Sequence, residues 1–217
     1  MNEPLPLVIA NHKANKTWEE LSSWIDTVGE KTAQFQGTVI LAPSTPFLFS
    51  AFQKISQANF NIKLASQDIS QFEQGAHTGD FAASQINKIV SFGIIGHSER
   101  RNSFQETDEI LVSKVKAAIE GQIKPVFCVQ DESTLVPEGI GIVAYEPISA
   151  IGTGNPDTPE NAQEVSTKLR ETHQRTVLYG GSVTPQNVKS FLKKGEIDGV
   201  LVGTASLDPE EFVKIIE

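Results

Sequence analysis

Eight short apolar runs alternate along this chain with longer amphipathic segments. Each run is too short for a helix, and several are rich in valine and isoleucine, which predicts strands. Alternation of strands with helices through the whole chain implies parallel strands, and eight of them predict a closed (β/α)8 barrel of the α/β class. No glycine-rich dinucleotide-binding motif follows the first run, which argues against an open sheet. The runs are Leu7–Ala10, Thr38–Ala42, Ile62–Ser66, Phe92–Ile95, Pro125–Val129, Gly141–Ala144, Thr176–Tyr179 and Gly199–Val202.

The helical segments carry recognisable start signals. Thr17 and Glu20 have the spacing of a capping box ahead of an apolar stripe. Thr107 precedes a second stripe that ends near Gly121. Three further helices are predicted where a capping side chain comes directly before a proline, at Thr158–Pro159, Thr184–Pro185 and Asp208–Pro209.

One repeat of the pattern is abnormally short. Only 16 residues separate Cys128 from Tyr145, and they include the sixth strand. The segment Gln130–Gly139 is too short for a helix of usual length with two loops. We therefore expect the fifth helix of the barrel to be shortened or missing, with a turn or a single helical turn in its place. The sequence shows no linker-like composition, so we expect residues 1–217 to form a single domain.

Composition excludes several classes of function. The 217-residue chain has a net charge of −9, which argues against nucleic-acid or anionic-membrane partners. No stretch approaches the ~20 apolar residues of a membrane span, and no signal-peptide pattern begins the chain. Cys128 is the one cysteine, which excludes an internal disulfide and fits a reducing compartment. We expect a cytoplasmic protein.

A carboxylate stands directly after the sixth strand, in the sequence AYEPISAIGTG. Most glutamates are solvated loop residues, but Glu146 follows a buried strand and would point into the mouth of a parallel barrel. The small residues that follow, Gly152 among them, suit a mobile lid that excludes water from a reaction. Glu146 is thus the candidate catalytic base.

Polar side chains follow two other strands at the same rim. Asn11 and Lys13 share one face of an extended segment while His12 faces away. Lys13 would bind an anionic substrate and stabilise developing negative charge. His97, after the fourth strand, suits proton transfer and carbonyl polarisation, although an isolated histidine is about as often structural. Glu99 is placed to pair with Lys13 across the rim.

The loops after the last two strands have the composition of a phosphate site. Gly180, Gly181 and Ser182 follow the seventh strand, and Gly203 and Thr204 follow the eighth. Barrel enzymes commonly hold phosphate on backbone N–H groups of these two loops. The four histidines lie in different repeats and no HExxH or CxxC motif occurs, so we expect no metal and no cofactor. A carboxylate base with a neutral electrophile suits proton abstraction next to a carbonyl.

These motifs together resemble the triosephosphate isomerase family. The resemblance rests on AYEPISAIGTG, GHSERR, YGGSV and the Asn-x-Lys after the first strand, and it covers nearly the whole chain. It implies a TIM barrel that interconverts dihydroxyacetone phosphate and D-glyceraldehyde 3-phosphate in glycolysis and gluconeogenesis. Glu146 would move the proton through an enediolate, neutral His97 would polarise the carbonyl, and Lys13 and Asn11 would hold the substrate. The phosphate would bind at Gly152, Ser182, Gly203 and Thr204.

The sequence also departs from that family's pattern. Ser149 stands in the lid where tryptophan is usual, His12 where tryptophan is common, and Thr204 where a second glycine is usual. The segment Gln67–Asp80 resembles the family's interdigitating dimer loop, with Thr78 at its inserted tip. The resemblance therefore implies a homodimer. Short members of the family with a reduced fifth helix are often tetramers, so a homotetramer is the alternative.

Three other functions are compatible with the residues alone. The chain would be a different sugar-phosphate barrel enzyme if it failed to convert dihydroxyacetone phosphate. It would be a non-catalytic phosphate-binding barrel if it bound a phosphate-bearing analogue without turnover, which the presence of Lys13, His97 and Glu146 disfavours. It would be a truncated structural scaffold if it were unstable and of mixed oligomeric state.

Overall fold

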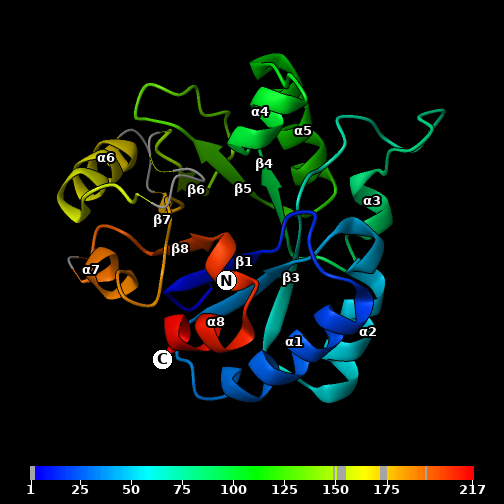
Figure 1. Cartoon of the computed structure of the whole chain (residues 1–217). Coiled ribbons are helices and arrows are strands. Elements are labelled where there is room, and N and C mark those ends of the chain that lie inside the picture. The colour runs from blue at the N-terminus through cyan, green and yellow to red at the C-terminus, as the bar shows by residue number, and fades with distance from the viewer. Residues whose placement is uncertain (1–2, 149, 151–154, 172–174, 194) are drawn as a thin grey trace.

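Eight parallel strands close into one barrel in chain order, from β1 to β8 and back to β1 (Figure 1). The computed structural model describes residues 3–148, 150, 155–171, 175–193 and 195–217. All eight predicted strands are present, with ends that differ from the prediction by at most one residue. The strands are β1 (Leu7–Asn11), β2 (Thr38–Ala42), β3 (Ile62–Ser66), β4 (Phe92–Ile95), β5 (Lys124–Val129), β6 (Ile142–Tyr145), β7 (Thr176–Tyr179) and β8 (Gly199–Val202).

Helices surround the barrel. They are α1 (Trp18–Thr32), α2 (Leu48–Ala58), α3 (Ala83–Ile86), α4 (Ser98–Ser103), α5 (Asp108–Glu120), α6 (Pro159–Glu171), α7 (Val188–Leu192) and α8 (Pro209–Ile216), with short 3-10 turns η1 (Thr45–Phe47) and η2 (Thr204–Ser206). The capping box of Thr17 and Glu20 starts α1 as predicted. Asp208 caps α8 by accepting the N–H groups of Glu210 and Glu211.

The predicted start of one helix is wrong. Thr184–Pro185 predicts a helix that begins at Pro185, but α7 begins three residues later, at Val188. The Asn187 side chain accepts the Thr184 N–H at 2.8 Å and donates to the Ser182 carbonyl at 3.1 Å. These two hydrogen bonds hold residues 185–187 in a turn, and a local sequence signal does not reveal them.

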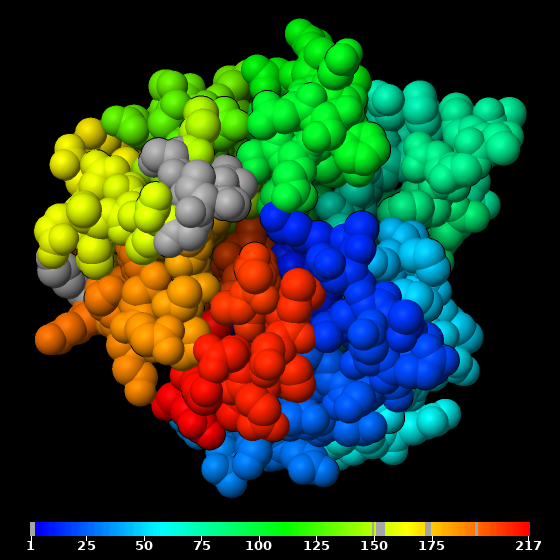
Figure 2. All heavy atoms as spheres, viewed as in Figure 1, coloured from blue at the N-terminus to red at the C-terminus, as the bar shows by residue number. Residues whose placement is uncertain are grey.

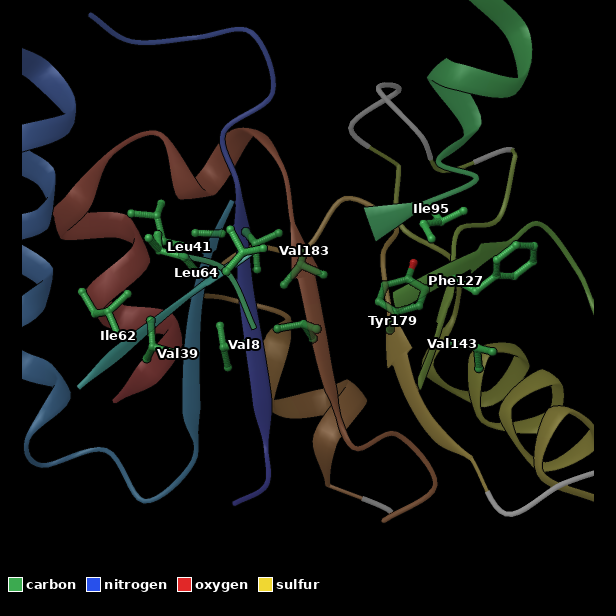
Figure 3. Close-up of a cluster of buried hydrophobic side chains, with 14 of the residues drawn as sticks. Val8, Val39, Leu41, Ile62, Leu64, Ile95, Phe127, Val143, Tyr179 and Val183 are labelled. Atoms are coloured by element: carbon green, nitrogen blue, oxygen red, sulfur yellow. The ribbon is translucent and has the colours of Figure 1, made fainter. Parts of the chain in front are cut away.

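Strand residues alternate between two apolar cores. One core is built from strand residues alone and fills the barrel; it includes Leu7, Ile9, Ile40, Phe92, Ile94 and Leu178. The other lies between the strands and the helices, where Val8, Val39, Leu41 and Leu64 point outward (Figure 3). This alternation is the period of two that a strand imposes, and a packed interior leaves the rim as the place for chemistry.

No helix follows β5, as the sequence predicts. Residues 130–141 form turns and lead directly into β6. A groove of about 570 Å³ lies between α5 and this segment. Its walls expose Val112, Ile119 and Leu135, of which Leu135 is 61% exposed. The missing helix thus leaves an apolar strip uncovered beside α5.

The segment between β3 and α3 projects from the barrel (Figures 1 and 2). Residues 72–80, which include Thr78, are all exposed. Ser70 donates to Asp80 at 2.6 Å across the base of the loop, and Phe72 stacks on His77 at 4.0 Å. The loop is therefore held in shape by contacts between its own residues. Within the described ranges, no helix combines the length and hydropathy required to span a bilayer.

Candidate active site

Glu146 lies at the rim formed by the carboxyl ends of the strands and is 2% exposed. It follows β6, and its backbone N–H donates to the Val129 carbonyl at 2.8 Å, which extends the pairing of β6 with β5. Oε1 lies 3.2 Å from His97 Nε2, and Oε2 accepts the backbone N–H of Ser98 at 3.1 Å. The carboxylate predicted as the base is therefore in direct contact with the predicted histidine.

The hydrogen bonds of His97 define which ring nitrogen carries the proton. His97 caps the N-terminus of α4, and its Nδ1 accepts the backbone N–H of Glu99 at 3.2 Å. A neutral imidazole that accepts at Nδ1 carries its proton on Nε2. Nε2 is the atom that faces Glu146 and the barrel mouth. His97 is thus a donor toward the site.

Lys13 reaches the same rim from β1. Its Nζ lies 2.5 Å from Glu99 Oε1, which confirms the predicted pairing across the rim. The Lys13 backbone has φ of +52°, and its N–H donates to Asn11 Oδ1 at 3.1 Å. The Lys13 carbonyl accepts from Gln67 Nε2 and Ser44 Oγ, each at 2.9 Å. The loops after β1, β2 and β3 together hold the lysine in a sparsely populated conformation.

The residues predicted to bind phosphate border this site. A Cβ on Gly203 would lie 3.8 Å from Lys13 Cε, so the loop after β8 runs beside the lysine. Thr204 begins η2 directly after it. Ser182, in the loop after β7, has φ of +51° and donates to the Ala150 carbonyl at 2.6 Å. Gly152 lies outside the described residues.

Two glycines of the loop after β7 are closely packed against neighbouring side chains. A Cβ on Gly180 would lie 3.0 Å from Glu146 Cγ, and one on Gly181 would lie 2.5 Å from the Tyr179 hydroxyl. The loop therefore passes directly against the base.

Burial and the nearby Asp157 carboxylate raise the pKa of Tyr145, and burial raises the pKa of Tyr179, so both phenols stay protonated.

Two buried neighbours of the site are chemically quiet. Burial, with the adjacent Glu146 carboxylate, raises the pKa of the Cys128 thiol well above its usual value. A thiol that stays protonated is a poor nucleophile. His12 faces away from the barrel mouth as predicted and meets the edge of Trp24 on α1 at 4.7 Å. Among the described residues, no cluster of His, Cys, Asp and Glu side chains would hold a metal ion.

Sequence reasoning missed three residues that hold the site together. Gln67 and Ser44 follow strands at the same rim as Lys13, and that position is the signal that would have found them. The Ser98 N–H that binds Glu146 leaves no trace in the sequence, since every residue but proline carries one.

Comparison with known proteins identifies the same family as the motifs. The family model described as triosephosphate isomerase matches residues 6–217. The triosephosphate isomerase of Aquifex aeolicus is 35% identical and that of Mesomycoplasma hyorhinis 36%, each over 97% of this chain and at least 97% of the relative. The crystal structure of triosephosphate isomerase from Bartonella henselae superposes with a TM-score of 0.84 at 27% identity, over 97% of both chains.

The alignment with the Aquifex protein runs over 243 positions, whereas this chain has 217 residues. The relative therefore carries residues that this chain lacks, in agreement with a barrel that has lost a helix. The family match spans the barrel and every described residue of the candidate site. The chain belongs to the triosephosphate isomerase family.

Proposed function

We propose that this chain interconverts dihydroxyacetone phosphate and D-glyceraldehyde 3-phosphate, with Glu146 as the base that moves the proton. The observation that carries the proposal is the 3.2 Å contact between Glu146 Oε1 and His97 Nε2 in the barrel mouth, beside Lys13. A carboxylate, a neutral donor and a cation are what proton abstraction next to a carbonyl requires.

Glu146 takes a proton from C1 of dihydroxyacetone phosphate. The C–H electron pair then forms the C1–C2 double bond, and the π pair of the carbonyl moves onto O2 to give an enediolate. The same carboxyl group then returns a proton to C2, which leaves the aldehyde at C1. A base that is 2% exposed and accepts the Ser98 N–H is held close to one position. A fixed base removes much of the entropic cost of bringing the reacting groups together.

His97 donates from Nε2 to the substrate oxygens and carries a proton between O2 and O1 of the enediolate. The Glu99 N–H on Nδ1 supports this role, because it holds the ring in the tautomer with the proton on Nε2. The contact of Nε2 with Glu146 would be exchanged for one with the substrate oxygen. Lys13 stabilises the enediolate charge, and Asn11 positions the substrate and the Lys13 backbone.

Ser182, Gly203, Thr204 and Gly152 bind the phosphate, largely through backbone N–H groups. The position of Gly203 beside Lys13 supports this role, since an anion there meets both an ammonium group and main-chain donors. The hydrogen bond from Ser182 to the Ala150 carbonyl links the phosphate loop to the lid segment. Lid closure over the enediolate would prevent loss of phosphate.

The protein acts in the cytoplasm as a homodimer, with Thr78 of the projecting loop inserted into the partner. A free, buried Cys128 and an acidic net charge support that compartment. Nine consecutive exposed residues in the loop support an intermolecular role for it. A homotetramer remains the alternative assembly.

The test is steady-state turnover of glyceraldehyde 3-phosphate by the wild type and by Glu146→Gln. Loss of the base should lower kcat by roughly 10²- to 10⁴-fold. Glu146→Asp retracts the carboxylate and should lower kcat much more than it raises KM. Glu164→Gln, an exposed glutamate on α6, is the matched control and should behave as wild type. Wild type without turnover refutes the isomerase, and unchanged kcat in Glu146→Gln refutes the assigned base.

A further inference from the structure

The Arg101 side chain binds backbone carbonyl groups at the carboxyl ends of two neighbouring strands, β4 and β5. Arg101 belongs to the last turn of α4, and its side chain is 13% exposed. Nε donates to the Gly96 carbonyl at 2.8 Å, and Nη2 donates to the Cys128 carbonyl at 3.2 Å. One guanidinium therefore joins the residue before His97 to the end of β5.

The two carbonyl groups lie where the pairing of β4 and β5 ends. The last paired residues are Ile95 and Phe127. Beyond that pair the chains separate, and the Gly96 and Cys128 carbonyls take the guanidinium as a shared donor. A planar guanidinium presents several N–H groups in a fixed fork, so it sets the spacing of the two acceptors. Lysine has no such fork.

Each of the two residues whose carbonyl binds Arg101 lies next to a candidate catalytic residue. Gly96 has φ of +74° and immediately precedes His97; a Cβ there would lie 3.0 Å from Arg101 Nη2. Cys128 lies against the Glu146 carboxylate, and the next residue, Val129, accepts the Glu146 N–H at 2.8 Å. The distance between His97 and Glu146 is thus determined in part by the distance between these two carbonyl groups.

We propose that Arg101 is a positioning residue that sets the geometry between His97 and Glu146 by bridging the ends of β4 and β5. The inference rests on the proposed isomerase function. Asp108, 3.2 Å from Nη1, and the Phe127 ring, 5.5 Å from the guanidinium carbon, hold Arg101 itself in place. No helix follows β5 in the described segment 130–141, so this bridge secures the strand end directly.

Three variants test the bridge. Arg101→Ala should lower kcat by roughly 10- to 100-fold with a much smaller change in KM, because misplacing the base and donor affects the transition state more than ground-state binding. Arg101→Lys keeps the charge but reaches one carbonyl, and should lie between Arg101→Ala and wild type. Arg170→Met is the matched control, because Arg170 also joins a carbonyl, that of Glu196 at 3.0 Å, to an aspartate, away from the site.

Added guanidinium chloride separates positioning from general destabilisation. At concentrations well below those that unfold the wild type, guanidinium should restore kcat of Arg101→Ala, whereas urea and sodium chloride should not. Restoration of Arg101→Ala, with no effect on Arg170→Met, supports the bridge. Wild-type kcat in Arg101→Lys or Arg101→Ala, or a loss that guanidinium does not restore, overturns it.

If Arg101→Ala does not fold, the Arg101→Lys comparison decides. Wild type without turnover refutes the proposed function, whereas an active wild type with unaffected Arg101 variants refutes this inference alone.

Discussion

At the scale of single residues, His12 is the least conventional choice in the core. It is 1% exposed, and among the described residues neither ring nitrogen makes a hydrogen bond of ordinary geometry. Burial, with the nearby positive charge of Lys16, lowers the pKa of His12 to about 3. The folded protein thus keeps a neutral imidazole at pH values where the unfolded chain takes up a proton.

This residue should make the protein sensitive to acid. The folded pKa lies below the unfolded value of about 6.5, so the contribution is fully present above that pH and is lost as the pH falls toward 3. Between pH 7.5 and 5.5 the wild type should lose about 1.4 kcal/mol more free energy of unfolding than His12→Phe. Urea unfolding of both proteins at the two pH values measures this. Parallel pH dependences would exclude His12 as the cause.

At the scale of elements, the first three strand-to-helix loops act as a unit around Lys13. Gln67 Nε2 donates to the Lys13 and Ala42 carbonyls, each at 2.9 Å, and so ties the loop after β3 to those after β1 and β2. Each of these carbonyl groups also accepts a second hydrogen bond, the Lys13 carbonyl from Ser44 Oγ and the Ala42 carbonyl from the His12 N–H at 3.1 Å. Together with the Ser44 hydroxyl, this contact offsets the cost of the positive φ at Lys13.

Replacing Gln67 should reveal how much that unit contributes. Gln67→Leu removes two hydrogen bonds and leaves each carbonyl with its other donor, so it should cost about 1–3 kcal/mol of unfolding free energy in total. Gln67→Glu should cost more at pH 8, since a carboxylate then faces two carbonyl oxygens, and less at pH 5, where protonation supplies a donor. Chemical denaturation at both pH values is the measurement. If the free energy of unfolding of Gln67→Glu were no higher at pH 5 than at pH 8, relative to the wild type, this prediction would be wrong.

At the scale of the whole molecule, two exposed surfaces are candidate interfaces between copies of the chain. The projecting loop at residues 72–80 is polar at its tip, whereas the groove left by the missing helix exposes Ile119 and Leu135. Sedimentation velocity should show a dimer of twice the 23.6 kDa chain mass. Thr78→Arg should shift that dimer toward monomer, because a long charged side chain does not fit an inserted tip. Leu135→Asn is the control and should keep the dimer; a wild type of four times the chain mass that Leu135→Asn halves would instead indicate a tetramer joined through the groove.

Much of the architecture follows from local rules. Val39 and Ile40 alternate between the two cores because a strand has a period of two, and Thr17 and Asp208 start helices because their side chains accept the first free N–H groups. The short interval between Cys128 and Tyr145 predicts a shortened or missing helix after β5, and the described segment 130–141 contains no helix. The sequence predicts the rim residues Lys13, His97 and Glu146 because each lies within two residues of the end of a buried strand.

Tertiary structure alone decided how those residues meet. Ser98 binds Glu146, Gln67 binds Lys13, and Arg101 binds the Cys128 carbonyl. These three hydrogen bonds join residues 27 to 54 positions apart, in three different pairs of repeats. Such contacts depend on the register in which the barrel closes and on which backbone groups are left unpaired where the strands separate. Neither quantity is encoded in the neighbourhood of any single residue, so the sequence names the chemical groups of the site while the closed barrel determines their distances.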